Sequence, residues 1–241
     1  MALSATIHHF HVTLSDVDRA VYETLELRVA RHPSESGRYL TTRTLAYCLS
    51  YEEGIAFSKG GLSSAEEPPI TVRDPTGILL AWIDVGFPSA ERLHKAAKAA
   101  RRVALYTHID AALLRREAAT RAVHKVGDIE VWRFEPSFLD AVEGSIGRTT
   151  TLEIVRTDGR LYVTVDENVI EGELVRVPWS MLKRRKIARA QARHTAEYVV
   201  ARFCPLALSF FFASPSFSTR GISLASILSA ARISSARRPS F

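Results

Sequence analysis

The feature that most constrains the fold is an unbroken run of six apolar residues, 78–83, which ends in a single carboxylate, Asp84. A glycine and a proline follow within four residues, and Ser89 then begins a helical pattern. An apolar run of this length predicts a strand that is covered on both faces. Because the turn into the helix is short, we expect a parallel crossover to the apolar segment 103–108. The strand at 78–85 should be the most buried strand of its sheet.

The N-terminal segments predict a hairpin followed by a helix. Residues 5–14 and 22–30 alternate in polarity, which predicts two antiparallel strands. The side chains of Leu25, Leu27 and Val29 should share one face of the second strand. Ser34 is the expected N-cap of the next helix. One face of that helix should carry the following residues: Leu40, Thr44, Tyr47 and Cys48.

The central and later segments continue the alternation of strands and helices. A short strand is expected within 66–72, followed by a tight turn at 74–77. The helix that begins at Ser89 should pack through Leu93, Ala96, Ala97 and Ala100. A helix is then expected at 110–123, a strand at 129–135 and an antiparallel meander at 149–177. A type I′ turn at Asp158 and Gly159 should join the first two meander strands.

Together these elements predict an α/β fold with a mixed sheet that is flanked by helices and extended by the antiparallel meander. In such sheets, sites form at the carboxyl ends of strands and at the adjoining helix starts. Asp84 has that position, and Glu35 lies at a predicted helix start just beyond another strand. Two converging carboxylates would suit Mg²⁺ or Mn²⁺ and hydrolysis of phosphodiesters.

Each candidate residue also has a structural interpretation. Glu35 in a first helical turn would be favoured there by the helix dipole, and Asp84 could form an Asx turn with the backbone after it. Lys95 could supply the cation of the site, although it points largely away from the packing stripe, and Arg92 could serve instead. Arg43 could contact phosphate or pair with an acidic residue.

The three N-terminal histidines invite a metal-site interpretation, because His9 and His11 share a strand face. No carboxylate or further histidine lies nearby in the sequence, so we interpret His8, His9 and His11 as residues of a solvent-facing strand. Cys48 and Cys204 are far apart and indicate neither a disulfide framework nor a cysteine zinc site.

Charge is distributed unevenly along the chain. Residues 181–241 hold 11 basic residues and one acidic residue, a net charge of +10, whereas residues 1–180 hold 21 basic and 25 acidic residues, a net charge of −4. We therefore divide the chain into a domain at 1–180 and a basic, serine-rich tail at 181–241. The tail is expected to be largely disordered. A membrane-surface helix and sequence never selected to fold are the alternatives.

No secretory signal pattern and no apolar run long enough to span a bilayer are present, so we expect a cytoplasmic protein without a membrane partner. The sequence also lacks a glycine-rich phosphate loop, a nucleophile elbow and a dinucleotide fingerprint. These absences remove the common nucleotide-binding and hydrolase classes that such motifs mark.

Four stretches of the sequence resemble the YaeQ family of small bacterial proteins, and the resemblance covers residues 1 to about 180. They are MALSATI at the start, ARHPSE at 30–35, AWIDVGFPSAERLHKA at 81–96 and RVALYTH at 102–108. The segment IEVWRF and the closing meander agree with the same family. No substrate is established for this family, and a link to transcription has been suggested for it.

The YaeQ family is in turn similar in fold to the PD-(D/E)XK nucleases, the restriction-endonuclease-like fold. That resemblance implies that Glu35, Asp84 and Lys95 are catalytic residues and that Glu35 and Asp84 bind the metal. It places the first acid of the motif at a position that is Pro69 in this chain. One expected metal ligand is therefore missing unless Glu67 or Asp74 replaces it.

Two function classes follow. The first is a divalent-metal-dependent nuclease, which the retained Glu35 and Asp84 favour. The second is a non-catalytic module that binds nucleic acid or a protein partner, which Pro69 and the negative charge of residues 1–180 favour. The sequence does not decide between them.

Overall fold

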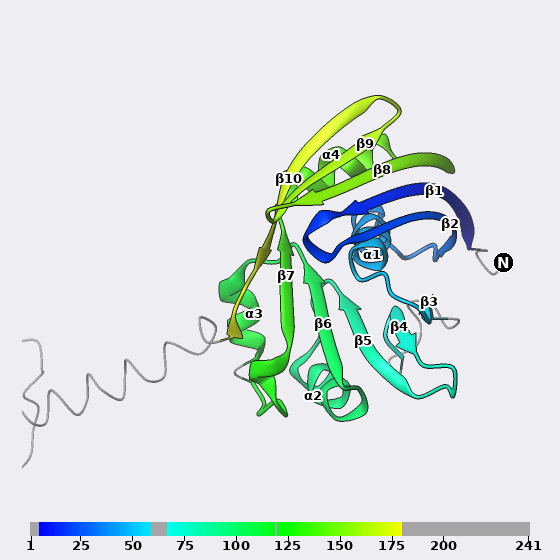
Figure 1. The fold of residues 1–241 in the computed structure, drawn as a ribbon. Helices are drawn as coiled ribbons and strands as arrows, with labels where there is room; N and C mark the ends of the chain where they lie inside the picture. Colours follow the sequence, from blue (N-terminus) through cyan, green and yellow to red (C-terminus); the bar gives the residue numbers. More distant parts are fainter. Residues whose placement is uncertain (1–4, 59–66, 119, 180–241) are drawn as a thin grey trace, which may run out of the picture. The chain divides into compact units, whose positions relative to one another are not determined.

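The computed structural model describes residues 5–58, 67–118 and 120–179 (Figure 1). The chain divides into two units, residues 1–189 and 190–241, and all described elements belong to the first. The interpretations of the tail at 181–241 lie outside the described residues. Within the described part, every helix falls short of the length and apolarity that a membrane span requires.

Ten strands form one sheet in the order β2-β1-β8-β9-β10-β7-β6-β5-β4-β3. The strands are β1 (Thr6–Asp16), β2 (Val21–Arg31), β3 (Ile55–Phe57), β4 (Ile70–Arg73), β5 (Leu79–Val85), β6 (Arg102–Thr107), β7 (Glu130–Phe134), β8 (Thr149–Thr157), β9 (Arg160–Val165) and β10 (Asn168–Arg176). The helices are α1 (Gly37–Leu49), α2 (Ala90–Ala99), α3 (Ala111–Ala118) and α4 (Pro136–Ser145), with short 3-10 turns η1 (Val17–Arg19) and η3 (Val126–Asp128). The expected mixed α/β fold is confirmed.

The crossover predicted from the apolar run is present. β5 pairs in parallel with β6 and antiparallel with β4, so it lies inside the sheet. Ser89 caps α2 by accepting a hydrogen bond from the backbone N–H of Arg92 at 3.2 Å. The expectation that β5 would be the most buried strand is wrong by a small margin. Five of the seven residues of β5 are buried, against five of the six residues of β6, because the first two residues of β5 lie beside the exposed turn at 74–77.

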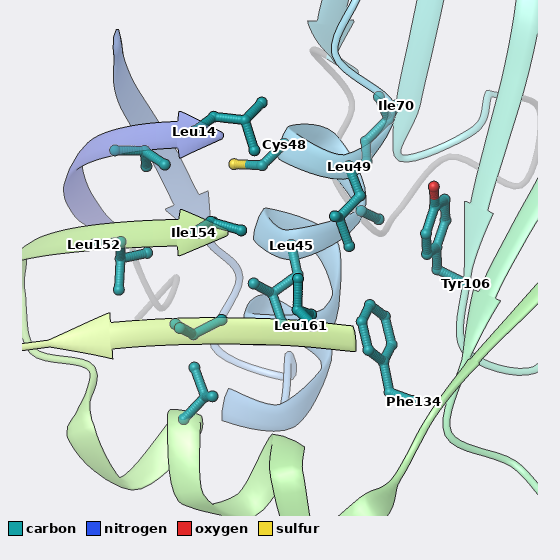
Figure 2. Packing of buried hydrophobic residues seen from close by; sticks show 14 of the residues in the cluster. Leu14, Leu45, Cys48, Leu49, Ile70, Tyr106, Phe134, Leu152, Ile154 and Leu161 are labelled. Atoms are coloured by element: carbon teal, nitrogen blue, oxygen red, sulfur yellow. The ribbon is translucent and has the colours of Figure 1, made fainter. Parts of the chain in front are cut away.

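β10 joins the sheet into one piece by pairing with two different neighbours. Its residues 168–173 pair with β9, and residues 174–176 pair with β7. We call β2, β1, β8, β9 and β10 the meander half of the sheet, and β7, β6, β5, β4 and β3 the crossover half. Figure 1 shows α1 between these halves. The main core is contributed by both halves together with α1 and α4, as Figure 2 shows for part of it.

Helix α1 is buried around most of its circumference, which the sequence did not indicate. The buried residues of α1 are Leu40, Thr41, Thr42, Arg43, Thr44, Leu45, Ala46, Cys48 and Leu49. Its threonines tolerate burial because their hydroxyls donate to the backbone carbonyls four residues earlier, at 2.7–3.0 Å. The single packing face that we expected is therefore too narrow, since the helix is enclosed by two halves of a sheet.

The C-terminal end of α1 is held by a side chain from the β1–β2 connection. Arg19 in η1 donates to the carbonyl oxygens of Leu49 at 2.5 Å and Tyr51 at 2.6 Å. A guanidinium at this end satisfies carbonyls that have no partner within the helix and is favoured by the helix dipole. The hairpin of β1 and β2 is thereby tied to the buried helix.

A second, smaller core covers the other face of the crossover half. Leu93 and Ala96 of α2 and Leu114 of α3 pack there. Their partners on the strands are Trp82, Val103, Leu105 and Val131, and Trp179 joins the same cluster. Trp179 is 4% exposed and follows a hydrogen bond from Val177 N–H to the carbonyl of Val131 at 2.8 Å. The packed body therefore extends at least to Trp179.

Several local predictions are confirmed and others need correction. β1 and β2 pair antiparallel, with the predicted leucines and valine buried, and Asp158 and Gly159 both have the positive φ that a type I′ turn requires. Helix α3 ends at Ala118, earlier than the predicted 123. Helix α4 was not predicted, although Pro136 at its first turn is a recognised start signal.

The packing of α4 on the meander half depends on the absence of a side chain at Gly172 in β10. A Cβ atom there would lie 2.4 Å from the ring of Phe138 in α4, whereas a Cβ at Gly144 in the same helix would meet nothing within 4 Å. We expect Gly172→Ala to lower the free energy of unfolding by about 1–3 kcal/mol through overpacking. Gly144→Ala should leave it unchanged or raise it by up to about 1 kcal/mol. Urea unfolding of both variants measures the difference, and equal effects would contradict this packing.

Candidate functional site

Glu35 precedes α1 and does not lie in its first turn. The N-cap is Ser36, whose Oγ accepts the backbone N–H of Tyr39 at 3.1 Å, so the predicted cap at Ser34 is wrong. The Ser34 hydroxyl bonds instead to the ring of His32 at 2.6 Å. Glu35 therefore belongs to the loop between β2 and α1, and the helix-dipole interpretation does not apply to it.

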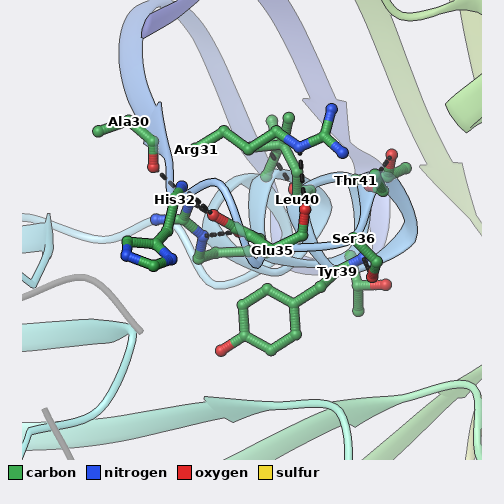
Figure 3. Close-up of polar contacts among 12 residues, drawn as sticks. Ala30, Arg31, His32, Glu35, Ser36, Tyr39, Leu40 and Thr41 are labelled. Carbon is green, nitrogen blue, oxygen red and sulfur yellow. Dashed lines mark hydrogen bonds and ion pairs between the residues drawn. The ribbon is translucent and has the colours of Figure 1, made fainter. Parts of the chain in front are cut away.

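The Glu35 carboxylate is buried and fully engaged, as Figure 3 shows. Arg43 donates from Nε to Oε1 at 3.1 Å and from Nη2 to Oε2 at 3.0 Å, an arrangement that binds both oxygens. The backbone N–H of His32 donates to Oε2 at 3.1 Å. Glu35 is 3% exposed and Arg43 is 5% exposed. Of the alternatives for Arg43, pairing with Glu35 is the one that the structure contains.

Arg43 also links this loop to the edge of the sheet. Its Nη2 donates to the carbonyl oxygen of Ala30 in the edge strand β2 at 2.9 Å, and its guanidinium lies 5.5 Å from the ring centre of Phe57. Arg31 reinforces the same loop by donating to the Glu35 carbonyl at 3.0 Å. The ion pair of Glu35 and Arg43 therefore joins the start of α1 to the end of β2.

Asp84 lies near the carboxyl end of β5 and is also held by an arginine. Arg92 Nε donates to its Oδ2 at 2.6 Å, and Trp82 Nε1 donates to the same oxygen at 3.2 Å. The other oxygen accepts the backbone N–H of Val85 at 3.2 Å. This N–H belongs to the next residue in the chain, whereas the Asx turn we considered would use an N–H two residues on. Arg92 donates in addition to the carbonyl of Glu67 at 2.8 Å.

The cation beside Asp84 is therefore Arg92. The sequence alone leaves Lys95 and Arg92 as alternatives for this position. Lys95 lies three residues further along α2 and is half-buried. The Arg92 guanidinium is 21% exposed and lies 5.7 Å from the ring centre of Trp82. A cation–π contact of this kind adds to the ion pair. The catalytic role of Lys95 stays a prediction.

The two carboxylates belong to different faces of the crossover half. Side chains alternate along a strand, so Asp84 shares the α2 face with Trp82, whereas Ile83 and Val85 face α1. Glu35 lies at the start of α1. Each carboxylate is thus neutralised by an arginine from the helix on its own side, and a cation shared by Glu35 and Asp84 stays a prediction.

Tyr39 lies between the two ion pairs, and sequence reasoning missed it. A Cβ atom on Gly86, just after β5, would lie 3.6 Å from the Tyr39 ring. Burial, and after it the negative charge of Asp84, raises the pKa of Tyr39 to about 12, with smaller effects from Arg43, Glu35 and Arg92. The spacing of four residues between Glu35, Tyr39 and Arg43 is the signal that could have identified it.

The described residues do not fit a divalent metal centre. No group of three or more histidine, cysteine or acidic residues that could hold an ion occurs among them. Pro69 is buried where the first acid of the motif was expected. Of the two substitutes, Glu67 accepts the Ser58 hydroxyl at 3.0 Å, and Asp74 closes its own turn by accepting the N–H groups of Thr76 and Ile78, both at 2.9 Å.

The N-terminal histidines separate between the two faces of β1. His8 is 8% exposed and bonds through its ring to the carbonyl of Gly147 at 2.9 Å, so its assignment to solvent is wrong. It follows the alternation that buries Phe10 and Val12. His11 is exposed and lies 3.9 Å from Glu26, in agreement with a solvent-facing position.

Comparison with known proteins decides the family. The sequence profile described as YaeQ protein matches residues 1–174 of this chain. The chain belongs to the YaeQ family. The YaeQ protein of Escherichia coli (strain K12), which is named as uncharacterised, is 33% identical over 177 residues, covering 72% of this chain and 96% of that protein.

Solved structures of the YaeQ family agree with the fold. The crystal structure of YaeQ from Pseudomonas syringae superposes with a TM-score of 0.66 at 28% identity, covering 72% of this chain and 96% of that one. For YaeQ from Xanthomonas axonopodis pv. citri the TM-score is 0.67 at 26% identity, covering 73% and 99% of the two chains. The tail at 181–241 lies beyond the residues that match the family profile.

The ion pair of Asp84 and Arg92 should contribute to stability far more than an exposed pair on the same helix. Asp84→Ala removes the buried carboxylate that Arg92 contacts at 2.6 Å, so we expect the free energy of unfolding to fall by about 2–4 kcal/mol. The control is Glu91→Ala, which breaks an exposed pair with Arg121 at 3.0 Å and should change it by less than about 1 kcal/mol. Denaturant unfolding compares the two, and similar losses would show that the Asp84 pair is only a surface contact.

The raised pKa of Tyr39 predicts a specific loss of stability at high pH. An unfolded tyrosine ionises near pH 10, whereas folded Tyr39 keeps its proton up to about pH 12. The unfolded state therefore loses its proton first, and the stability contributed by Tyr39 should fall as the pH rises from about 10 to about 12. Tyr39→Phe has no ionisable group at this position. The unfolding free energy of the wild type should therefore fall relative to that of the variant over this pH range. A difference independent of pH would contradict the assignment.

Proposed function

We propose that this YaeQ-family protein binds nucleic acid without cleaving it. The observation that carries the proposal is that both candidate catalytic carboxylates are neutralised, Glu35 by Arg43 and Asp84 by Arg92. A carboxylate that binds a hard cation must present its oxygens to that cation. Here the oxygens of both acids are already used within the protein. Each acid has an arginine and a backbone N–H as hydrogen-bond partners, the N–H of His32 for Glu35 and that of Val85 for Asp84.

Releasing these carboxylates for a metal would be costly. Breaking a buried pair and leaving one partner uncompensated costs about 3–5 kcal/mol, and Arg43 would at the same time lose its aligned contact beside Ala30. A single metal site would need both releases, and the Pro69 side chain has no oxygen to replace the missing acid. These considerations favour a protein that keeps a nuclease-like fold and not the chemistry.

Nucleic acid is the partner that the charge distribution favours. The net charge of −4 for residues 1–180 is an unfavourable average, but the tail carries +10, and positive charge gains affinity for phosphates by releasing counterions. The resemblance to the PD-(D/E)XK nucleases points in the same direction. A metal-dependent nuclease is the second candidate, because both acids, Glu35 and Asp84, are retained in the sequence.

Metal addition separates the two candidates. We expect 5 mM Mg²⁺ or Mn²⁺ to leave the melting temperature of the full chain unchanged beyond the general effect of ionic strength, and calorimetric titration to show no saturable heat. A metal ion that binds the folded protein would instead stabilise it by about 2.7 kcal/mol when its free concentration is 100 times its Kd. Labelled duplex and single-stranded oligonucleotides should be bound and stay intact with either ion.

Asp84→Asn is the control for both measurements, since it keeps the shape of the side chain and removes its charge. Metal-dependent stabilisation or cleavage that disappears in Asp84→Asn would establish the nuclease and refute the proposal. Cleavage that persists in this variant would indicate a contaminating nuclease.

A further inference from the structure

We propose that nucleic acid binds to the outer helical layer formed by α2 and α3, through its phosphate backbone and without sequence selection. This inference rests on the proposed function and adds to it the face of the protein that is used. We call residues 90–133 the basic layer, since they contain α2, β6, α3 and most of β7. The candidate catalytic carboxylates Glu35 and Asp84 lie outside this segment.

The folded body is divided in charge, which its net value conceals. The basic layer holds 10 basic and 5 acidic residues, a net charge of +5. The remaining residues of 1–180 hold 11 basic and 20 acidic residues, a net charge of −9. A polyanion is attracted by positive charge and repelled by negative charge, so the segment 90–133 is the part of 1–180 whose net charge favours its binding. The body can therefore bind phosphate despite its negative total.

Three arginines of the basic layer form ion pairs with acidic residues, the first of them being Arg92 with Asp84 at 2.6 Å. Arg102 lies 2.6 Å from Glu52 and 3.7 Å from Glu130, and Arg121 lies 3.0 Å from Glu91. Six other basic residues of the layer form no ion pair with an acidic residue in the described part of the chain. They are Lys98, Arg101, Arg115, Arg116, Lys125 and Arg133.

Three of these six residues, Lys98 in α2 and Arg115 and Arg116 in α3, are carried by helices that pack on the same face of the sheet. Leu93 of α2 and Leu114 of α3 are buried in one cluster with Val103 and Val131 of the strands. The polar sides of both helices therefore turn away from that cluster, and Lys98 and Arg116 are exposed on them. Two helices with their basic sides outward on one face offer several contacts to a single polyanion.

The same layer contains the point at which the described chain ends. Trp179 packs in the cluster of α2 and α3, and the sequence continues with KRRK at 183–186. These four basic residues lie within seven positions of Trp179 in the sequence. They add positive charge, which raises affinity for phosphates by releasing counterions.

An anionic membrane surface would select different residues. Helices that bind at such an interface insert large apolar side chains between the lipid headgroups. Within 90–133, Leu113 is the one exposed large hydrophobic residue among those the structure describes. Charge without apolar anchors suits a hydrated phosphate backbone, for which contacts with arginine and lysine side chains supply most of the affinity.

A pair of charge reversals in the full chain tests the inference. The test variant combines Lys98→Glu in α2 with Arg116→Glu in α3. The control variant combines Arg28→Glu in β2 with Arg148→Glu before β8, which are exposed and lie outside the basic layer. Both variants change the net charge by the same amount and keep the tail, so a difference between them reports position alone.

Fluorescence anisotropy with a 20-base-pair duplex gives the affinity at several salt concentrations. For the test variant we expect at least a 10-fold loss of affinity near 50 mM salt, and a log–log salt slope that is smaller by about 2, because each phosphate contact contributes about 0.9. The control variant should lose less than about 3-fold. Melting temperatures show that both variants are folded, and the neutral pair of Lys98→Gln and Arg116→Gln should give an intermediate loss.

The outcomes separate the two proposals. If the wild type binds the duplex and both variants weaken it equally, the assignment to the basic layer is overturned and the proposed function stands. If the wild type does not bind nucleic acid, both fall. If it binds vesicles containing phosphatidylserine but not the duplex, and only the test variant loses this, the face is correct and the partner is wrong, which also overturns the inference as stated.

Discussion

The structure depends on the burial of α1 between the two halves of a ten-stranded sheet. A helix enclosed in this way must satisfy every polar group within the protein, because water is excluded from it. Threonine hydroxyls bond within the helix, Arg19 holds the C-terminal carbonyls, and Glu35 neutralises Arg43. The same contacts bind the helix to β2 and to the β1–β2 connection. The burial of α1 therefore accounts both for these stabilising contacts and for the pairing of Glu35 with Arg43.

This constraint explains why the Glu35 carboxylate is occupied within the protein. Arg43 is nearly inaccessible, and an arginine stays charged in proteins, so it needs an anionic partner wherever it is buried. Glu35 is that partner. On the other face of the sheet, Arg92 and Trp82 have the corresponding relation to Asp84. Each of the two acids thus forms an ion pair with an arginine of a helix, Glu35 with α1 and Asp84 with α2.

Charged residues in the core form ion pairs, whereas the charge of the chain as a whole is unevenly distributed. In the core, Glu35 is paired with Arg43, and Asp16 is paired with Arg19 and Arg156. Along the sequence, charge is separated into the basic layer at 90–133 and an acidic remainder. Balanced pairs contribute little field at a distance, but separated surface charge produces a field that can steer a polyanion. The surface proposed for binding is therefore separate in sequence from the two carboxylates, Glu35 and Asp84, that the sequence suggested as a catalytic site.

The sequence by itself determined the elements and much of their order. The apolar run at 78–83 predicted β5 and its parallel crossover, and alternation predicted the hairpin and the meander, since these patterns are local and their periods differ between strand and helix. It did not predict α4, whose pattern was short, or the first residue of α1, where it pointed to Ser34 as the cap and the structure has Ser36. Only the tertiary structure decided that α1 is buried on nearly all sides, that β10 serves both halves of the sheet, and that Arg43, Arg92 and Tyr39 surround the acids. These depend on contacts between residues far apart in the chain, and local periodicity carries no information about which distant side chain will neutralise a buried charge.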